Sequence, residues 1–569
     1  MKINDPNFLH LTGTDQGAYD SAAQAVLDGT LPKEPYYYNP GYYYFLALIY
    51  LVCGHNLDTA LKVQFLIGLS TYFLIYLIAK RIFNKTVGFI AISLCSLYGI
   101  FMIYEGLFLS SVLETFLLAL SIFLLLQNAD KPSAKGFFFT GIIIGLSVLT
   151  RPNIILLIPI YFLWIATRLW SQKKRLLLVY LVMTIGIIGI ISPVTIRNYT
   201  YSGKFILVSS NGPINFWIGN NPDATGSYRL SPFAKVLEDR MKKEGRDLWV
   251  SDALTFIKER PEQYVKLLLK KFCLFWASYE PADNDIVYER MKGQSSLLRM
   301  PFILGFGIIA SLGLGGILLS LRRWWGKGLL LYLVILGYMS TVIAFFVQSR
   351  FRVAMIPYLI VFAGFCLYYW YDKFQKKEYK KLYLSLCPAI IFYLMVNFQT
   401  YFGWTHPYFH PNGEYVESRN GLIIRDDSGE WHGKEVNVLD SPDKIIKKEL
   451  IINSDISQFK DAVLILNYFA NDQGELLIKV NEYQFPKISC SQITYGQFMR
   501  LAKLGFKPNH LKRGINIITL RVTPTAIVQI PTDNWRNYGR SYFSSNGIDW
   551  ERIEEEFMIE IELSKTTQI

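Results

Sequence analysis

Four arginines stand out in this sequence because each lies at the edge of an apolar block. Arg151 occurs in the short gap TRPN, Arg197 in IRNY, and Arg350 and Arg352 in QSRFR. A guanidinium group binds phosphate oxygens through a planar fork of N–H donors. An arginine at a membrane boundary is otherwise disfavoured without a partner, although it can extend to lipid headgroups. The pattern therefore favours a phosphate site, with lipid anchoring as the alternative.

Two acids accompany these arginines. Asp15 lies in the polar stretch LTGTDQGAYDSAAQAVLDG before the first apolar segment, where a helix-capping turn aspartate is the simpler interpretation. Glu114, in SSVLETFLL, is expected about two helical turns inside a span, where an acid is either functional or paired, for example with Arg151. A carboxylate base beside phosphate-binding arginines would suit glycosyl transfer from a lipid phosphate. Candidate substrate contacts are Tyr19, Tyr38, Glu105 and Asn198.

The composition is that of a membrane protein. The chain has 569 residues, of which 51% are hydrophobic, and a mean hydropathy of +0.24. The net charge of +13 comes from Lys and Arg clusters between the apolar blocks, which indicates orientation in a lipid bilayer and not nucleic-acid binding. The blocks have the length of bilayer spans. We predict about ten spans, at roughly 61–80, 87–103, 107–127, 136–150, 154–170, 176–192, 300–320, 328–346, 353–371 and 382–399.

Every second gap between these spans is basic. Cytoplasmic loops carry such an excess of Lys and Arg. We therefore predict that the other gaps, the long loop 193–299 and both termini are external. Residues 41–56 are apolar but short, and a further span there would invert every later loop, so a juxtamembrane or re-entrant helix is expected. The basic gaps lie at 80–85, 131–135, 168–175, 322–327 and 373–381.

The fold class predicted is a polytopic α-helical membrane protein with a C-terminal all-β sandwich. Its parts are an external acidic loop with juxtamembrane helices (1–60), a transmembrane module (61–399) and an external sandwich domain (400–569). The loop 193–299 is expected to open with short strand-like runs and to continue as helices near 232–245 and 250–276. Six strand-like runs separated by turns predict the sandwich. They are KELIINS, AVLILNYF, GELLIKVNEY, GINIITLRV, TAIVQIP and EFMIEIEL.

Seven stretches in order across roughly residues 10–370 resemble the GT-C membrane glycosyltransferases. The resemblance is to the bacterial protein O-mannosyltransferase-like group, which includes the lipopolysaccharide-core and aminoarabinose transferases. It places the family's loop acid on Asp15 and its acid at the outer end of a later span on Glu114. The stretches are TDQGAYDSAAQAVLDG, YYYNPGYYYFLALIYLVCG, LYGIFMIYEGLFLSSVLETFLLAL, GLSVLTRPNIILLIP, SPVTIRNYTYSGKF with IGNNPDATGSY, IKERPEQYVKLLLKKFCLFW and QSRFRVAMIPYLIVFAG.

The resemblance implies a polyprenyl-phosphate sugar donor and an inverting transfer on the extracytoplasmic side of the cell membrane. Asp15 would activate the acceptor, which is a protein, a lipid or a polysaccharide. The sequence departs from the pattern because the span expected before Asp15 is absent and Gln16 replaces a second acid. We assign no cofactor, and the sequence gives no support for a divalent metal. The tail resembles a galactose-binding-like jelly roll in LKRGINIITLRV and SYFSSNGIDWERI.

Two other classes remain as alternatives. A polytopic transporter would suit about ten spans, but transporter sites lie near the bilayer midplane in interrupted helices. The acids and arginines here are expected at the outer boundary, which favours an enzyme. An inactive glycan-binding membrane protein, in which the tail binds glycan, is the third class.

Overall fold

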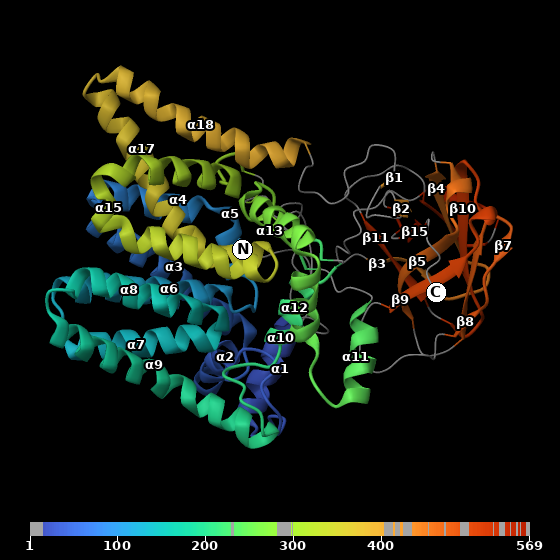
Figure 1. Ribbon diagram of the computed structural model, residues 1–569, viewed down its shortest axis with the longest axis horizontal. Helices are drawn as coiled ribbons and strands as arrows, with labels where there is room; N and C mark the ends of the chain where they lie inside the picture. Colours follow the sequence, from blue (N-terminus) through green and yellow to red (C-terminus); the bar gives the residue numbers. More distant parts are fainter. Residues whose placement is uncertain are drawn as a thin grey trace. The chain divides into compact units, whose positions relative to one another are not determined.

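The computed structural model forms two compact units, Met1–Asp283 with Val287–Thr405, and Asn284–Ile286 with His406–Ile569. Each unit is described by itself (Figure 1). In the first, the structure describes residues 15–222, 224–228, 233–280, 298 and 300–402. In the second it describes residues 414–564 except 416–420, 425–434, 453–454, 471–473, 490–499, 527, 534–540, 547, 553–555 and 558.

The first half of the helical unit consists of apolar helices joined by short turns. Three of them begin at a side chain that caps the first turn: Asn56, Asn84 and Ser133 accept hydrogen bonds from the backbone N–H groups of Thr59, Val87 and Gly136. The elements are α1 (Asp15–Leu27), α2 (Pro40–Cys53), α3 (Leu57–Ile82), α4 (Lys85–Leu97), α5 (Gly99–Glu105), α6 (Ser111–Asp130), α7 (Ala134–Thr150), η1 (Pro152–Leu157), α8 (Ile158–Leu169) and α9 (Lys173–Ser202).

The second half contains one long bent helix, α15 (Phe306–Ala344). The Ser320 hydroxyl and the Tyr332 hydroxyl are 2.7 Å apart, which a straight helix forbids because twelve residues rise about 18 Å. Figure 1 shows α15 turning back at one end. The predicted spans 300–320 and 328–346 are therefore two limbs of one helix. The other elements are α10 (Gly212–Gly219), α11 (Phe233–Glu244), α12 (Trp249–Glu259), α13 (Pro261–Trp276), α16 (Ser349–Arg352), η2 (Val353–Met355), α17 (Ile356–Gln375) and α18 (Tyr379–Phe402).

Within the described residues, seven helical segments are long and apolar enough to cross a membrane. The bent α15 counts once among them, so two of the ten predicted spans share one helix. The predicted spans 87–103 and 136–150 fall short of the length, because α4 has 13 residues and α7 has 17. The helix α4 ends where Leu97 and Gly99 exchange backbone hydrogen bonds with Leu304. The helix α2, predicted not to span, has 14 residues and is also too short.

The predicted basic gaps lie together at one end of the helices. Arg81 and Arg168 both form ion pairs with Asp130, and the ring of Phe83 packs on Trp324 beside the bend of α15. Figure 1 shows the α8–α9 connection, the bend of α15 and the α17–α18 connection at this end. The spatial grouping fits the alternation of basic gaps in the sequence; the side of the membrane stays a prediction.

The loop predicted at 193–299 differs from expectation at its start. The strand-like runs predicted there are wrong, because α9 continues through Pro193 to Ser202 and α10 follows. The two later helical stretches are confirmed as α11, α12 and α13. A small core of its own supports this region: Trp217 packs on Trp249, and its indole N–H donates to Asp252 at 2.7 Å.

The C-terminal unit is a sandwich of two antiparallel sheets, as predicted. One sheet has the order β1-β2-β15-β5-β11-β14, with β3 on β11 and β9 on β5; the other has the order β13-β12-β4-β10-β6-β7, with β8 on β6. Alternate residues of both sheets, such as Leu464 and Ile518, form one buried core. The strands are β1 (Glu414–Tyr415), β2 (Gly421–Ile424), β3 (Glu435–Leu439), β4 (Ile445–Ile452), β5 (Asp461–Ala470), β6 (Glu475–Val480), β7 (Tyr483–Gln484), β8 (Ile488–Ser489), β9 (Arg500–Phe506), β10 (Gly514–Val522), β11 (Val528–Asp533), β12 (Ser541–Ser544), β13 (Glu551–Arg552), β14 (Glu556–Phe557) and β15 (Ile559–Ser564).

Candidate functional site

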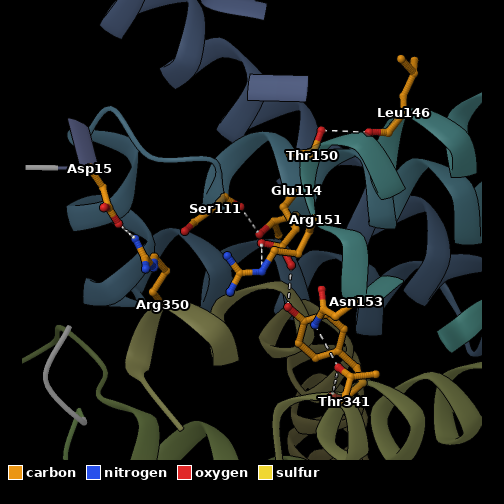
Figure 2. Close-up of polar contacts among 11 residues, drawn as sticks. Asp15, Ser111, Glu114, Leu146, Thr150, Arg151, Asn153, Thr341 and Arg350 are labelled. Atoms are coloured by element: carbon orange, nitrogen blue, oxygen red, sulfur yellow. Dashed lines mark hydrogen bonds and ion pairs between the residues drawn. The ribbon is translucent and has the colours of Figure 1, made fainter. Parts of the chain in front are cut away.

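An ion pair joins the start of the chain to a helix more than 300 residues later. Arg350 Nη1, on the short helix α16, lies 2.7 Å from Asp15 Oδ2, on the first residue of α1. The two side chains are 13% and 21% exposed, so the pair is largely buried but still open to a ligand. Figure 2 shows the two side chains pointing toward each other. The structure thus brings together the predicted base and one predicted phosphate ligand.

A second acid–arginine pair lies beside the first. Arg151 Nε, at the C-terminus of α7, is 3.9 Å from Glu114 Oε2, and Glu114 is only 1% exposed. The hydroxyl of Tyr338, from α15, donates to Glu114 Oε1 at 2.6 Å. The alternative considered for Glu114, a salt bridge to Arg151, is present. The depth predicted for Glu114 is wrong: α6 begins at Ser111, so Glu114 lies in the first turn of that helix.

The ring of Phe351 connects the two pairs. The guanidinium carbon of Arg151 lies 4.0 Å from the ring centre and that of Arg350 lies 5.2 Å from it. Both arginines therefore gain a cation–π contact from one ring and are held as neighbours. Figure 2 shows the two guanidinium groups in the space between Asp15 and Glu114.

Helix α1 is held at this site by its own polar side chains. Gln16 Oε1 accepts a hydrogen bond from the backbone N–H of Phe108 at 2.9 Å. Tyr19 is 5% exposed and its hydroxyl bonds to the Ser110 side chain. Burial raises the pKa of the Tyr19 hydroxyl, the Asp15 charge adds to the rise, and Arg350 and Arg151 oppose it. Tyr19 thus senses all three charges and lies within the site, as predicted for a substrate contact.

Arg352 occupies a different environment from Arg350. Its Nη1 donates to the carbonyl oxygens of Phe275 and Ala277 at 3.1 and 2.8 Å, and its Nη2 donates to the Tyr279 carbonyl and to Glu280 Oε2 at 2.9 and 2.6 Å. The side chain is 1% exposed and stacks on Phe306. These contacts hold the end of α13 against the outer end of α15. They do not fit the predicted phosphate contact, because the guanidinium is buried and engaged by protein groups.

Arg197 and Asn198 also act within the protein in this structure. Arg197 donates to the carbonyl oxygens of Glu34 and Pro32 and stacks on the ring of Tyr36 at 3.9 Å. Asn198 is fully buried and bonds to the Tyr36 N–H and to the carbonyls of residues 206 and 208. The end of α9 therefore fastens the segment before α2. This explains both residues without the predicted donor and substrate contacts.

Tyr38 and Glu105 divide between the site and its support. The Tyr38 hydroxyl points at Asp15 Oδ1 at 3.4 Å, at the edge of hydrogen-bond range. Glu105 is buried and accepts a hydrogen bond from the Tyr72 hydroxyl at 2.7 Å. Gln64 donates to the carbonyls of Glu105 and Leu107 at 3.0 and 2.8 Å. Tyr38 is brought to Asp15, whereas Glu105 lies behind the loop that carries Phe108 and Ser110.

Two residues of the site were missed by sequence reasoning, Phe351 and Tyr338. Phe351 had a signal, because an aromatic residue between two arginines in RFR can stack on both neighbours. Tyr338 had none beyond the rule that a buried tyrosine hydroxyl requires a partner. Its partner Glu114 lies 224 residues earlier in the chain.

The described residues contain no group of three or more His, Cys, Asp or Glu side chains that could hold a metal ion. Asp15 lies next to Gln16 and to arginine, and residues 1–14 lie outside the described part of the chain. The pairs described above are therefore built from protein charges alone.

Residues 33–196 match the family model described as dolichyl-phosphate-mannose-protein mannosyltransferase. The resemblance to membrane glycosyltransferases inferred from the sequence is thereby confirmed over that segment. The matched segment contains Glu105, Glu114 and Arg151, whereas Asp15 and Arg350 lie outside it. Among curated proteins, none matches the chain.

Solved structures similar to this chain are membrane transferases, at low identity. The Archaeoglobus fulgidus oligosaccharyltransferase in the apo form is 16% identical over 69% of this chain and 52% of its own, with a TM-score of 0.41. ArnT from Cupriavidus metallidurans bound to undecaprenyl phosphate is 15% identical over 63% of this chain and 56% of its own, with a TM-score of 0.38. The chain thus spans about half the length of these structures.

Proposed function

We propose that this protein is a membrane glycosyltransferase that moves a sugar from a polyprenyl-phosphate donor to an acceptor hydroxyl outside the cell membrane. The observation that carries the proposal is the pairing of Asp15 with Arg350, beside the neighbouring Arg151. This arrangement puts a carboxylate and a phosphate-binding cation at one point. The family match over residues 33–196 supports a lipid-phosphate sugar as the donor class.

Asp15 is the proposed general base. A phosphate is already a good leaving group, so the difficult step is to make the acceptor hydroxyl nucleophilic. Asp15 takes the proton as the acceptor oxygen attacks the anomeric carbon. The bond from that carbon to the phosphate oxygen breaks, and the phosphate leaves with the electron pair. Attack opposite the leaving group inverts the anomeric configuration.

Arg350 and Arg151 are the proposed ligands of the donor phosphate. Two guanidinium groups on one phenylalanine ring concentrate positive charge where the leaving phosphate gains negative charge. Arg350 uses one nitrogen on Asp15, and a guanidinium has five N–H donors in a fixed fork. One arginine can therefore fix the distance between the base and the leaving group.

Glu114 is proposed to orient Arg151 and not to receive the acceptor proton. Its side chain is 1% exposed, and both carboxylate oxygens face protein groups, Tyr338 on one side and Arg151 on the other. A buried carboxylate held by a tyrosine is suited to fixing an arginine. Arg352, Arg197 and Asn198 hold the surrounding segments in place, and Tyr19 and Tyr38 line the site near Asp15.

The remaining assignments concern side and acceptor. The basic connections gathered at one end of the helices support a cytoplasmic position for that end, which places Asp15, the loop helices α10–α13 and the C-terminal sandwich outside. We propose a protein, a lipid or a polysaccharide as the acceptor. The family described for residues 33–196 acts on protein, which makes a protein hydroxyl the first acceptor to test.

The test is transfer of a labelled sugar from polyprenyl phosphate to acceptors in proteoliposomes. General-base assistance contributes about 10²–10⁴-fold, so Asp15→Asn should lose turnover on that scale while it keeps donor binding. Asp28→Asn, in the exposed stretch just after α1, is the matched control and should retain activity. Undiminished turnover of Asp15→Asn would remove Asp15 as the base. Absence of transfer by the wild type with every donor offered would refute the function.

A second substitution separates the roles of the two acids. Glu114→Gln keeps the Tyr338 contact but weakens the pairing with Arg151. It should therefore weaken donor binding more than it slows the bound-state reaction. If Glu114→Gln abolished turnover at saturating donor while Asp15→Asn did not, the roles of the two acids would be reversed.

A further inference from the structure

Helix α13 has an apolar face that no part of the described chain covers. Val265, Leu269 and Phe272 are 53%, 61% and 45% exposed. Their spacing of four and three residues places them on one side of the helix. On the next side lie the charged residues Glu262, Lys266 and Lys270, which follow each other at spacings of four.

The opposite side of α13 is fixed to the protein. Leu267, Leu274 and Phe275 are buried, and so is Lys271, whose ammonium donates to Asn220 Oδ1 at 2.9 Å. The exposed apolar face is therefore not the packing face of the helix. A helix that is apolar on two sides and charged between them is expected to contact two apolar environments.

The C-terminal end of α13 is held at the ends of two membrane helices. Trp276 stacks on Phe306, the first residue of α15, and the N–H of Ser278 donates to the carbonyl of Val396 in α18. Around these attachment points α15 and α18 expose further apolar side chains, among them Ile308 and Leu394 at 41% and 62%. The helix thus starts from the level at which the spanning helices end.

We propose that α13 lies in the membrane–water interface, with Val265, Leu269 and Phe272 in the acyl boundary of the bilayer and Lys266 and Lys270 toward the headgroups. A lipid surface is the occupant that suits this face, because the face continues the exposed apolar surface of α15 and α18. The lysines on its flank complement anionic headgroups. This inference does not depend on glycosyl transfer, since it concerns only the lipid contact of α13.

The contact has a consequence for the site, because α13 and the site share one short helix. Arg352 donates to the carbonyls of Phe275 and Ala277 at the end of α13, and Arg350 precedes it by two residues on α16. A lipid surface that holds α13 therefore also helps to fix the helix that carries Arg350.

The test uses the full chain in nanodiscs that contain phosphatidylcholine and phosphatidylglycerol. A spin label at Leu269→Cys, in a background without the six native cysteines, is compared with one at Lys266→Cys, which is 72% exposed on the charged side. We expect the Leu269 label to collide more with oxygen than with a water-soluble nickel chelate, and the Lys266 label to show the reverse. Water exposure of both labels would overturn the proposal. Spin–spin broadening at Leu269 would also overturn it, since a second copy would then cover the face.

A second measurement avoids the cysteine-free background. A photoreactive benzophenone residue at position 269 should form lipid adducts that mass spectrometry detects, and the same residue at position 266 should form few. Crosslinks from position 269 only to protein would overturn the proposal. Because both readouts measure lipid contact, a failure here is distinguishable from a failure of the transfer assay.

Discussion

The two ends of the helical unit use the same residue types in opposite ways. At the end that carries Asp15 and Glu114, the paired side chains are buried, with Arg151 and Arg350 only 14% and 13% exposed. At the other end Arg81, Arg168 and Asp130 form pairs with exposures of 32%, 40% and 53%. Exposed pairs contribute little to stability, whereas removal of one member of a buried pair leaves a charge that water does not reach. The comparison separates charges that orient the chain from charges that form a site.

The largest expected effect tests the most deeply buried cation. Arg352→Ala leaves Glu280 and the backbone carbonyls at the end of α13 without their donor. Loss of one partner of a buried pair costs about 3–5 kcal/mol, so the purified protein should melt far below the wild type or fail to accumulate. Arg352→Lys should recover part of this loss, because a lysine restores the charge without the fork. Normal melting of Arg352→Ala would show that burial does not predict a structural role here.

The next effect separates Arg350 from Arg352, two residues along the chain. Arg350→Ala should preserve melting but weaken binding of a polyprenyl-phosphate donor by about 1.5–3 kcal/mol, or about 10- to 150-fold. The measurement is donor titration in detergent or nanodiscs. Arg322→Ala, at the exposed other end, is the control and should bind donor as the wild type does. Equal donor affinity in Arg350→Ala and the wild type would reduce Arg350 to a partner of Asp15.

A buried lysine at the same end should make stability depend on pH. Burial lowers the pKa of Lys271 to about 7, whereas an unfolded lysine titrates near 10.4. Between these values the unfolded chain holds a proton that the folded chain has lost, so stability rises with pH in that window. Lys271→Met removes the titration. Its stability relative to the wild type should therefore fall by on the order of 2 kcal/mol as the pH rises from about 7.5 to 9.5.

Melting curves of the two proteins at several pH values check this expectation. A difference between them that does not change over the window would mean that Lys271 has its ordinary affinity for protons. Lys266→Met is the matched control, because Lys266 lies on the same helix and is exposed. That variant should show no such pH dependence.

The smallest expected effect lies at the exposed end. Asp130→Asn removes the shared partner of Arg81 and Arg168, and exposed pairs contribute about 0–1 kcal/mol. Its melting temperature and its transfer activity should stay close to those of the wild type. A loss comparable to that of Arg352→Ala would break the comparison between the two ends.

Much of the secondary structure could be predicted from local pattern alone. The strand β10 alternates buried and exposed positions along GINIITLRV, and this period of two is visible in the sequence. The helices α11–α13 follow from apolar periodicity in the loop. The bend of α15 and the break after α4 could not be placed in the same way. Contacts between residues distant in the chain decide both, Leu97 and Gly99 with Leu304 in the case of α4.

The sequence by itself determined that this is a polytopic helical protein with a β-sandwich tail, and it supplied Asp15, Glu114 and the arginines as candidates. Composition and periodicity are local properties, and they suffice for those conclusions. Only the tertiary structure decided which arginine meets which acid, because Asp15 and Arg350 are 335 positions apart. It also separated Arg350 from Arg352, whose neighbours in sequence are nearly the same. Successive side chains of a helix point in different directions, so one reaches Asp15 while the other is buried under the end of α13.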